Sequence, residues 1–340
     1  MKRISYPILK LFLILTIFNL VACNQEKIST STQENTTEIN QNQTENRQEK
    51  LNITVTIPPQ KYFVEKIGGE LVNVNVMIGP GLEPHTYEPQ PQQLTSLAES
   101  SAYVAIGVPF EEVWLNKITT ANPQIVMINS GEGINKIPLV GHDHDHSHEN
   151  DNHNHEDEHN EDIEHNESNY TSETSSPDPH IWLSPKLAKI QAENIYQGLV
   201  KINPENQQIY QENLTKFLTE IDNIDQQIKE KLAPINNRKF FIYHPAWGYF
   251  AQEYNLQQIP LEFEGQEVTS QELSNLIKQA KAEKINTVFA QPQFNNKTME
   301  IFAKEIGAEI VLLDDLAQNW SENMLSTADK LAKAMTNNTN

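Results

Sequence analysis

Histidine is the residue type with the clearest chemical potential in this sequence, because its 11 copies are spread very unevenly over the 340 residues. Eight lie in one acidic tract, and only His85, His180 and His244 lie in the parts of the chain with regular apolar patterning. Neutral imidazole is a preferred ligand of Zn²⁺ and also suits copper and nickel, whereas calcium and magnesium take oxygen ligands. Three histidines with one carboxylate or water would form a tetrahedral zinc site.

The elements that must position these histidines follow from the apolar patterning. Alternating β-branched runs predict strands, and amphipathic runs predict helices. The expected strands are 51–57, 71–78, 102–106, 125–129, 239–243, 285–290 and 309–313. The expected helices are 58–67, 90–99, 110–120, 185–201, 204–232, 248–254, 270–284, 295–306 and 321–335. Strands that alternate with helices predict an α/β fold with parallel sheets.

The alternation occurs twice, so we expect two parallel-sheet α/β lobes joined by a long rigid helix. The helix at 204–232 would be roughly 43 Å long, which suits a strut between two lobes. Ser184 is placed to N-cap the preceding helix, with Pro185 at its first position. Thr269 and Glu272 fit a capping box at the start of a later helix.

The predicted strand ends bring the chemistry-bearing residues together. Ligands of open parallel sheets bind beyond the carboxyl ends of the strands. His85 lies in the loop after the second strand, His244 directly follows the strand at 239–243, and Asp314 follows the last strand. His180 lies in a proline-bracketed turn before the linking helices. We therefore expect a metal site in the cleft between the lobes, with Asp314 or water as the fourth ligand.

Residues 142–167 form a second candidate metal-binding element. This tract interleaves eleven acidic residues with the histidines at positions His142, His144, His146, His148, His153, His155, His159 and His165. Such a composition binds borderline metals weakly and repeatedly. We expect the tract to gather zinc and pass it to the deeper site, and the alternative is a solvated acidic spacer.

The first residues predict export and lipidation. Lys2 and Arg3 precede an apolar run at 11–20, which is shorter than the roughly 20 residues that a membrane-spanning helix needs. Cys23 follows this run directly and is the only cysteine of the chain, as in a bacterial lipobox. An ordinary signal peptide with an incidental cysteine is the alternative. With Cys23 lipidated, the protein has neither a disulfide nor a thiolate ligand.

Composition completes the predicted organisation. The net charge of −21 argues against nucleic-acid binding, which needs clustered Lys and Arg. We expect a monomer, because no helix shows a surplus apolar face. The predicted segments are a lipoprotein signal peptide (1–23), a flexible tether (24–50), an N-terminal lobe (51–183) with the histidine-rich insertion (141–176), linking helices (184–235) and a C-terminal lobe (236–340).

Several motifs occur together in the order of a known family. They are PGLEPHTYEPQPQQL, DPHIWLSP, IYHPAWGYFAQEY, EGQEVTSQEL, VFAQPQF and LLDDLAQNW. In these motifs the chain resembles the zinc-binding solute-binding proteins of bacterial ABC importers, over nearly all of 51–335. The resemblance implies two α/β domains held by a long helix, metal in the cleft between them, and delivery to a membrane permease without catalysis.

The resemblance also assigns ligands. The three metal histidines of the family match His85, His180 and His244, and the third position favours zinc because manganese-type relatives have glutamate there. The carboxylate ligand corresponds to Asp314. Relatives commonly follow that aspartate with proline, whereas this chain has Asp315, so Asp314, Asp315 or water takes the fourth place. Gln291 stands where the family has an acidic residue, which argues against a ligand from that loop.

Two other functions remain open at this stage. A metal-buffering or adhesin-like surface lipoprotein would have the same composition without a transporter partner. A zinc hydrolase also uses three histidines and an open fourth position, but the chain has no HExxH pair.

Overall fold

The computed structural model describes residues 49–84, 86–139, 176–263, 265–295 and 297–337. The predictions for His85, Cys23, the eight histidines of the acidic tract, the signal peptide and most of the tether therefore lie outside the described residues. Among the helices in the described ranges, none combines the length and apolar character needed to cross a membrane.

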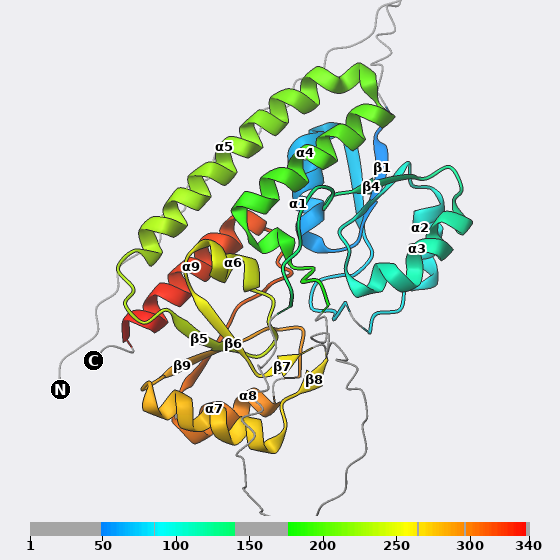
Figure 1. Ribbon diagram of the computed structural model, residues 1–340. Coiled ribbons are helices and arrows are strands. Elements are labelled where there is room, and N and C mark those ends of the chain that lie inside the picture. Colours follow the sequence, from blue (N-terminus) through cyan, green and yellow to red (C-terminus); the bar gives the residue numbers. More distant parts are fainter. Residues whose placement is uncertain (1–48, 85, 140–175, 264, 296, 338–340) are drawn as a thin grey trace, which may run out of the picture. The chain divides into compact units, whose positions relative to one another are not determined.

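The N-terminal lobe is a four-stranded parallel sheet with helices between its strands (Figure 1). Its elements are β1 (Leu51–Val55), α1 (Pro58–Gly68), β2 (Val72–Val76), α2 (Pro91–Ala98), β3 (Ala102–Ala105), α3 (Pro109–Ala121) and β4 (Val126–Asn129). A 3-10 turn at Gly69–Leu71 separates α1 from β2. The strand order is β2-β1-β3-β4, with β1 and β3 in the middle. All four residues of β3 are buried, as expected for a central strand covered on both faces.

The C-terminal lobe repeats this design. Its main sheet has the order β10-β9-β5-β6, and all its pairings are parallel. Its elements are β5 (Lys239–Ile242), α6 (Gly248–Glu253), β6 (Gln257–Pro260), α7 (Ser270–Ala282), β9 (Thr287–Ala290), α8 (Lys297–Ile306) and β10 (Glu309–Leu312). A small antiparallel hairpin, β7 (Glu262–Phe263) and β8 (Gln266–Glu267), follows β6. The prediction of two parallel-sheet α/β lobes is confirmed.

Two antiparallel helices connect the lobes. A 3-10 turn (Ile181–Leu183) leads into α4 (Pro185–Ile202), and a second one (Pro204–Asn206) leads into α5 (Gln207–Leu232). The 26 residues of α5 correspond to about 39 Å. It packs against α1, α4 and the last helix, α9 (Trp320–Asn337), so the strut contacts elements from both ends of the chain (Figure 1).

Local sequence signals account for most of these boundaries. Ser184 N-caps α4, because its hydroxyl accepts a 3.2 Å hydrogen bond from the Leu187 amide. Thr269 and Glu272 form the predicted capping box of α7. The sequence patterning missed β6 and the hairpin. The short strand β6 lies at the sheet edge, carries two glutamines and ends in proline, so it lacks a strand-like apolar pattern.

One core cluster runs from the N-terminal sheet through α4, α5 and α9 to one face of the C-terminal sheet. A second cluster lies between the opposite face of that sheet and helices α7 and α8. The central strands β5 and β9 thus have a packed core on each face.

Candidate metal centre

Two of the predicted histidines meet in the described structure. Nε2 of His180 lies 3.1 Å from Nε2 of His244, and the two residues are 4% and 2% exposed. His244 directly follows β5, whereas His180 precedes the 3-10 turn that leads into α4. Two nitrogens bound at 2.0–2.1 Å to one tetrahedral ion lie about 3.3 Å apart, so the observed separation is close to that of two ligands of one zinc ion.

Each imidazole is held from behind by a buried carboxylate. Nδ1 of His180 lies 2.7 Å from Oδ1 of Asp178, and Nδ1 of His244 lies 2.6 Å from Oε2 of Glu262. Each carboxylate can accept a hydrogen bond from Nδ1–H, and in a neutral ring of this tautomer the lone pair is on Nε2. Two Nε2 lone pairs then face each other, and a cation between them would remove the repulsion. Carboxylate-backed histidines of this kind are typical of metal sites.

The β7–β8 hairpin explains how Glu262 reaches His244. Its other carboxylate oxygen, Oε1, accepts a hydrogen bond from the backbone amide of Gly265 in the hairpin turn. Gly265 has φ +81°, a left-handed conformation that glycine adopts at low cost. Each carboxylate oxygen of Glu262 thus has a hydrogen-bonding partner, as a carboxylate in a residue that is only 2% exposed requires. The hairpin therefore supplies a rigid acceptor for one imidazole.

Two further contacts hold His244: Gln291 hydrogen-bonds to its backbone, and Phe294 stacks on its ring. Its amide donates to Oε1 of Gln291 at 3.2 Å, and its carbonyl accepts from Nε2 of Gln291 at 2.7 Å. The ring stacks on Phe294 with centroids 4.7 Å apart. Gln291 follows β9, the strand beside β5, so the neighbouring strand end aligns the histidine. A glutamate here could not donate the second of these bonds.

The predicted carboxylate ligand has other partners. Oδ1 of Asp314 accepts from Nε2 of Gln293 at 2.6 Å and from the Leu316 amide at 3.0 Å. Asp315, the other acid considered for the fourth place, is buried, with 4% of its surface exposed. Among the described residues, no three His, Cys, Asp or Glu side chains come together as a metal site. The described structure thus brings together His180 and His244 but does not add Asp314 to them.

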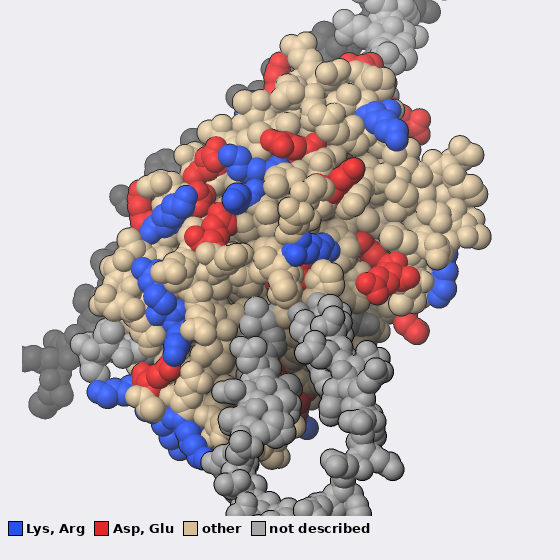
Figure 2. Space-filling view, in the orientation of Figure 1, with Lys and Arg blue, Asp and Glu red and all other residues tan. Residues whose placement is uncertain are grey.

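A cavity of about 530 Å³ adjoins His180. Its walls include Lys136 and Glu112 as well as Leu139, just before the histidine-rich insertion, and Ser176, the last residue of that insertion. Burial lowers the pKa of Lys136, and nearby carboxylates oppose this shift. On the face shown in Figure 2, basic and acidic side chains are interspersed, without the single-sign basic surface that nucleic acid requires.

The profile of the family described as "Zinc-uptake complex component A periplasmic", ZnuA, matches residues 53–339. The chain belongs to this family. A curated relative, the high-affinity zinc uptake system protein ZnuA of Bacillus subtilis (strain 168), is 28% identical over 272 residues, 79% of each chain. The zinc-binding lipoprotein AdcA of Streptococcus pneumoniae (strain ATCC BAA-255 / R6) is 25% identical over 84% of this chain and 55% of its own length.

Solved structures of ZnuA proteins have the same fold. One crystal structure of ZnuA is 43% identical, covers 84% of this chain and 99% of its own, and gives a TM-score of 0.73. A zinc-bound deletion mutant of ZnuA is 42% identical over 84% of this chain and 98% of its own, with the same TM-score. The recognition of the family from the sequence motifs is confirmed.

Two residues that hold the paired histidines, Asp178 and Glu262, were not predicted from the sequence. Asp178 has a local signal, because an aspartate two residues before His180 can accept that residue's amide, and it does so at 2.9 Å. Glu262 has no local signal. It lies 18 residues from His244 along the chain, and only the β7–β8 hairpin brings the two together.

Proposed function

We propose that this chain is the extracytoplasmic receptor of a bacterial ABC importer, which binds Zn²⁺ tightly and delivers it to the permease. The observation that carries the proposal is the pair of facing Nε2 atoms, each on an imidazole whose Nδ1 is backed by a buried carboxylate. Membership of the zinc-uptake family supports it. The family is a component of an uptake complex, so the chain is a binding protein and not an enzyme.

The proposed ligands are His85, His180 and His244. The fourth place belongs to Asp314, Asp315 or a water molecule. Imidazole ligands favour zinc over manganese, which prefers oxygen. Oδ1 of Asp314 accepts hydrogen bonds from Gln293 and from the Leu316 amide, so Oδ2 is the oxygen through which Asp314 would bind the ion.

The remaining organisation is part of the same proposal. Residues 1–23 are a lipoprotein signal peptide, Cys23 is the lipidated residue, and 24–50 tether the two lobes and their linking helices (51–183, 184–235 and 236–340) to the membrane as a monomer. The histidine-rich insertion at 141–176 gathers zinc for the central site. The zinc-bound ZnuA deletion mutant and the lipoprotein name of AdcA are consistent with these roles.

The test is a zinc titration in competition with a chelator, on residues 24–340. We expect one tight site and several weak ones in the wild type. His244→Ala should abolish the tight site and leave the weak ones, whereas His153→Ala should leave the tight site intact. Equal tight binding in wild type and His244→Ala would contradict the proposed site and would leave a metal buffer based on the insertion.

A further inference from the structure

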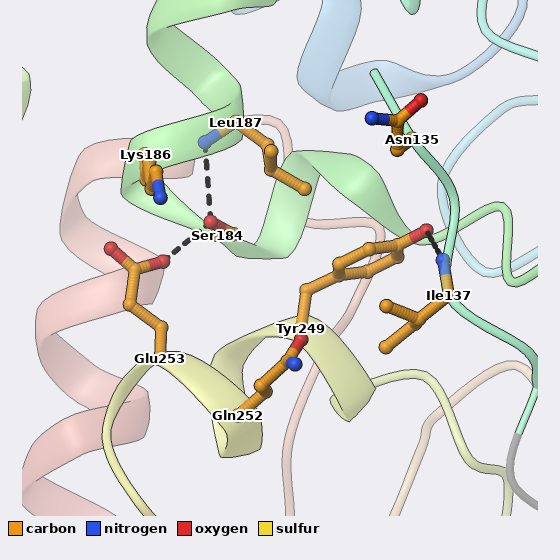
Figure 3. Close-up of a pocket in the computed structure, with 8 residues that line it drawn as sticks. All are labelled: Asn135, Ile137, Ser184, Lys186, Leu187, Tyr249, Gln252 and Glu253. Atoms are coloured by element: carbon orange, nitrogen blue, oxygen red, sulfur yellow. Dashed lines mark hydrogen bonds between the residues drawn. The ribbon is translucent and has the colours of Figure 1, made fainter.

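Tyr249 of α6 connects segments that are distant in sequence. Its side chain is 5% exposed, and its hydroxyl donates a 2.8 Å hydrogen bond to the backbone carbonyl of Asp178. The same hydroxyl accepts a 3.2 Å hydrogen bond from the amide of Ile137 (Figure 3). The Asp178 amide in turn donates to the Ile137 carbonyl at 2.8 Å. One phenol group thus closes a ring of hydrogen bonds around the backbone of Asp178.

Asp178 is the residue that orients the imidazole of His180. Its Oδ1 lies 2.7 Å from Nδ1 of His180 and also accepts that residue's amide. Any rotation of the Asp178 peptide would therefore move the Nε2 atom that faces His244. Tyr249 fixes this peptide from α6, which begins four residues after His244. The hydroxyl consequently ties the backbone of Asp178, two residues before His180, to the segment that carries His244.

Gly248 shows how closely α6 approaches the same carboxylate. A Cβ atom at this position would lie 2.7 Å from Oδ2 of Asp178, closer than real Cβ atoms come to other heavy atoms. The glycine therefore allows Tyr249, the next residue, to reach the Asp178 carbonyl. The close approach of Gly248 and the hydrogen bond of Tyr249 both place α6 directly against Asp178.

We propose that Tyr249 is a positioning residue for the two-histidine metal site, acting through Asp178. This inference rests on the proposed zinc-binding function. Because Ile137 lies on the segment that leads to the histidine-rich insertion, the same hydroxyl also anchors the base of that insertion to the site. Loss of a group that orients a metal ligand typically costs 10–100-fold in affinity. Tyr249 acts one residue further away, so we expect a loss of about tenfold, at the lower end.

The surroundings of the hydroxyl make the variant Tyr249→Phe a fair test. Tyr249 and Ile137 line a cavity of about 430 Å³ together with polar groups that include Gln252 and Glu253 (Figure 3). Water in this cavity can reach the freed Ile137 amide, so the variant has no obligatory buried, unpaired donor. The ring itself is retained, and the fold should persist.

The matched control is Tyr254→Phe. Tyr254 is the C-terminal cap residue of the same helix, is 6% exposed and donates a 2.9 Å hydrogen bond to Asp225, a residue of α5 with no part in the proposed site. Both variants therefore remove one buried phenol hydroxyl from one helix. Only Tyr249→Phe breaks a connection to Asp178.

The experiment measures zinc affinity by chelator competition and the visible absorption of bound Co²⁺, on the full chain without its signal peptide. We expect Tyr249→Phe to bind zinc about tenfold more weakly and to shift the Co²⁺ bands, with Tyr254→Phe like wild type. In an Asp178→Asn background, Tyr249→Phe should add little, because both act through one residue. If Tyr249→Phe kept wild-type zinc affinity and Co²⁺ bands, or if both tyrosine variants lost affinity equally, the role of Tyr249 would be overturned. The proposed zinc-binding function would be unaffected by either result. Absence of a tight site in the wild type would overturn the proposed function with it.

Discussion

The indole nitrogen of Trp320 donates a 2.7 Å hydrogen bond to the backbone carbonyl of Trp182, two residues beyond His180. The indole of Trp182 in turn donates to the carbonyl of Asp315 at 2.6 Å. Both side chains are 1% exposed. The 3-10 turn after His180 is therefore held by the segment between β10 and α9 and by the first residue of α9. This arrangement fixes His180 relative to the strand ends of the C-terminal lobe, which also carry His244.

Replacement of Trp320 by phenylalanine should destabilise the fold. The Trp182 carbonyl would lose its donor, and the smaller ring would leave a void beside Phe63, whose ring centroid lies 5.3 Å from that of Trp320. The two effects together should lower the free energy of unfolding by about 2–4 kcal/mol. Urea unfolding measures the change. Trp114→Phe is the control, because Trp114 is only half-buried, and a comparable loss there would contradict the special role of Trp320.

Glu262→Gln should weaken zinc binding about 10–100-fold, because an amide orients the His244 imidazole less strongly than a carboxylate does. The measurement is the same chelator competition. Glu267→Gln is the matched control, since Glu267 pairs with Glu262 across the hairpin but contacts Tyr243 instead of a metal histidine. If Glu262→Gln kept wild-type affinity, the carboxylate would have no part in orienting the ligand.

Zinc removal should lower the thermal stability of the wild type. A ligand that binds only the folded state at 100 times its Kd adds about 2.7 kcal/mol to the free energy of unfolding. Differential scanning calorimetry with zinc and then with excess chelator should show a corresponding fall in Tm. His244→Ala should show a much smaller shift. An equal shift in both proteins would place the stabilising ion elsewhere.

The pH dependence of stability should report on Glu220, which joins α5 to α1 and α9. Burial raises the pKa of this carboxyl group, but hydrogen bonds from Lys66, Ser321 and Tyr62 outweigh burial, so its pKa lies below the ordinary 4.5. The charged form therefore stabilises the fold above pH 4.5, and this contribution is lost as the pH falls through the lower folded-state pKa.

Glu220→Gln should accordingly be less stable than wild type at neutral pH, and the difference should shrink towards pH 3. Urea unfolding across this range measures it. Glu212→Gln, an exposed position on the same helix, should show no such trend. A difference that stayed constant down to pH 3 would mean that the charge of Glu220 contributes nothing.

Much of the architecture could be predicted from local signals. β-branched runs gave the strands of both sheets except β6, and the caps at Ser184 and Thr269 gave the starts of two helices. These signals are local because they depend on backbone propensity and on hydrogen bonds within one turn. The edge strand β6 was missed because its residues alternate weakly and end in Pro260.

The sequence by itself determined the family, since its motifs identify a zinc receptor and the family profile confirms this, and it predicted three histidine ligands. Only the tertiary structure decided how two of them are arranged. The contact of His180 with His244 joins segments 64 residues apart, and the support from Glu262 requires a hairpin with no strong sequence signal. Such contacts depend on how strands and helices pack, and local periodicity carries no information about that packing.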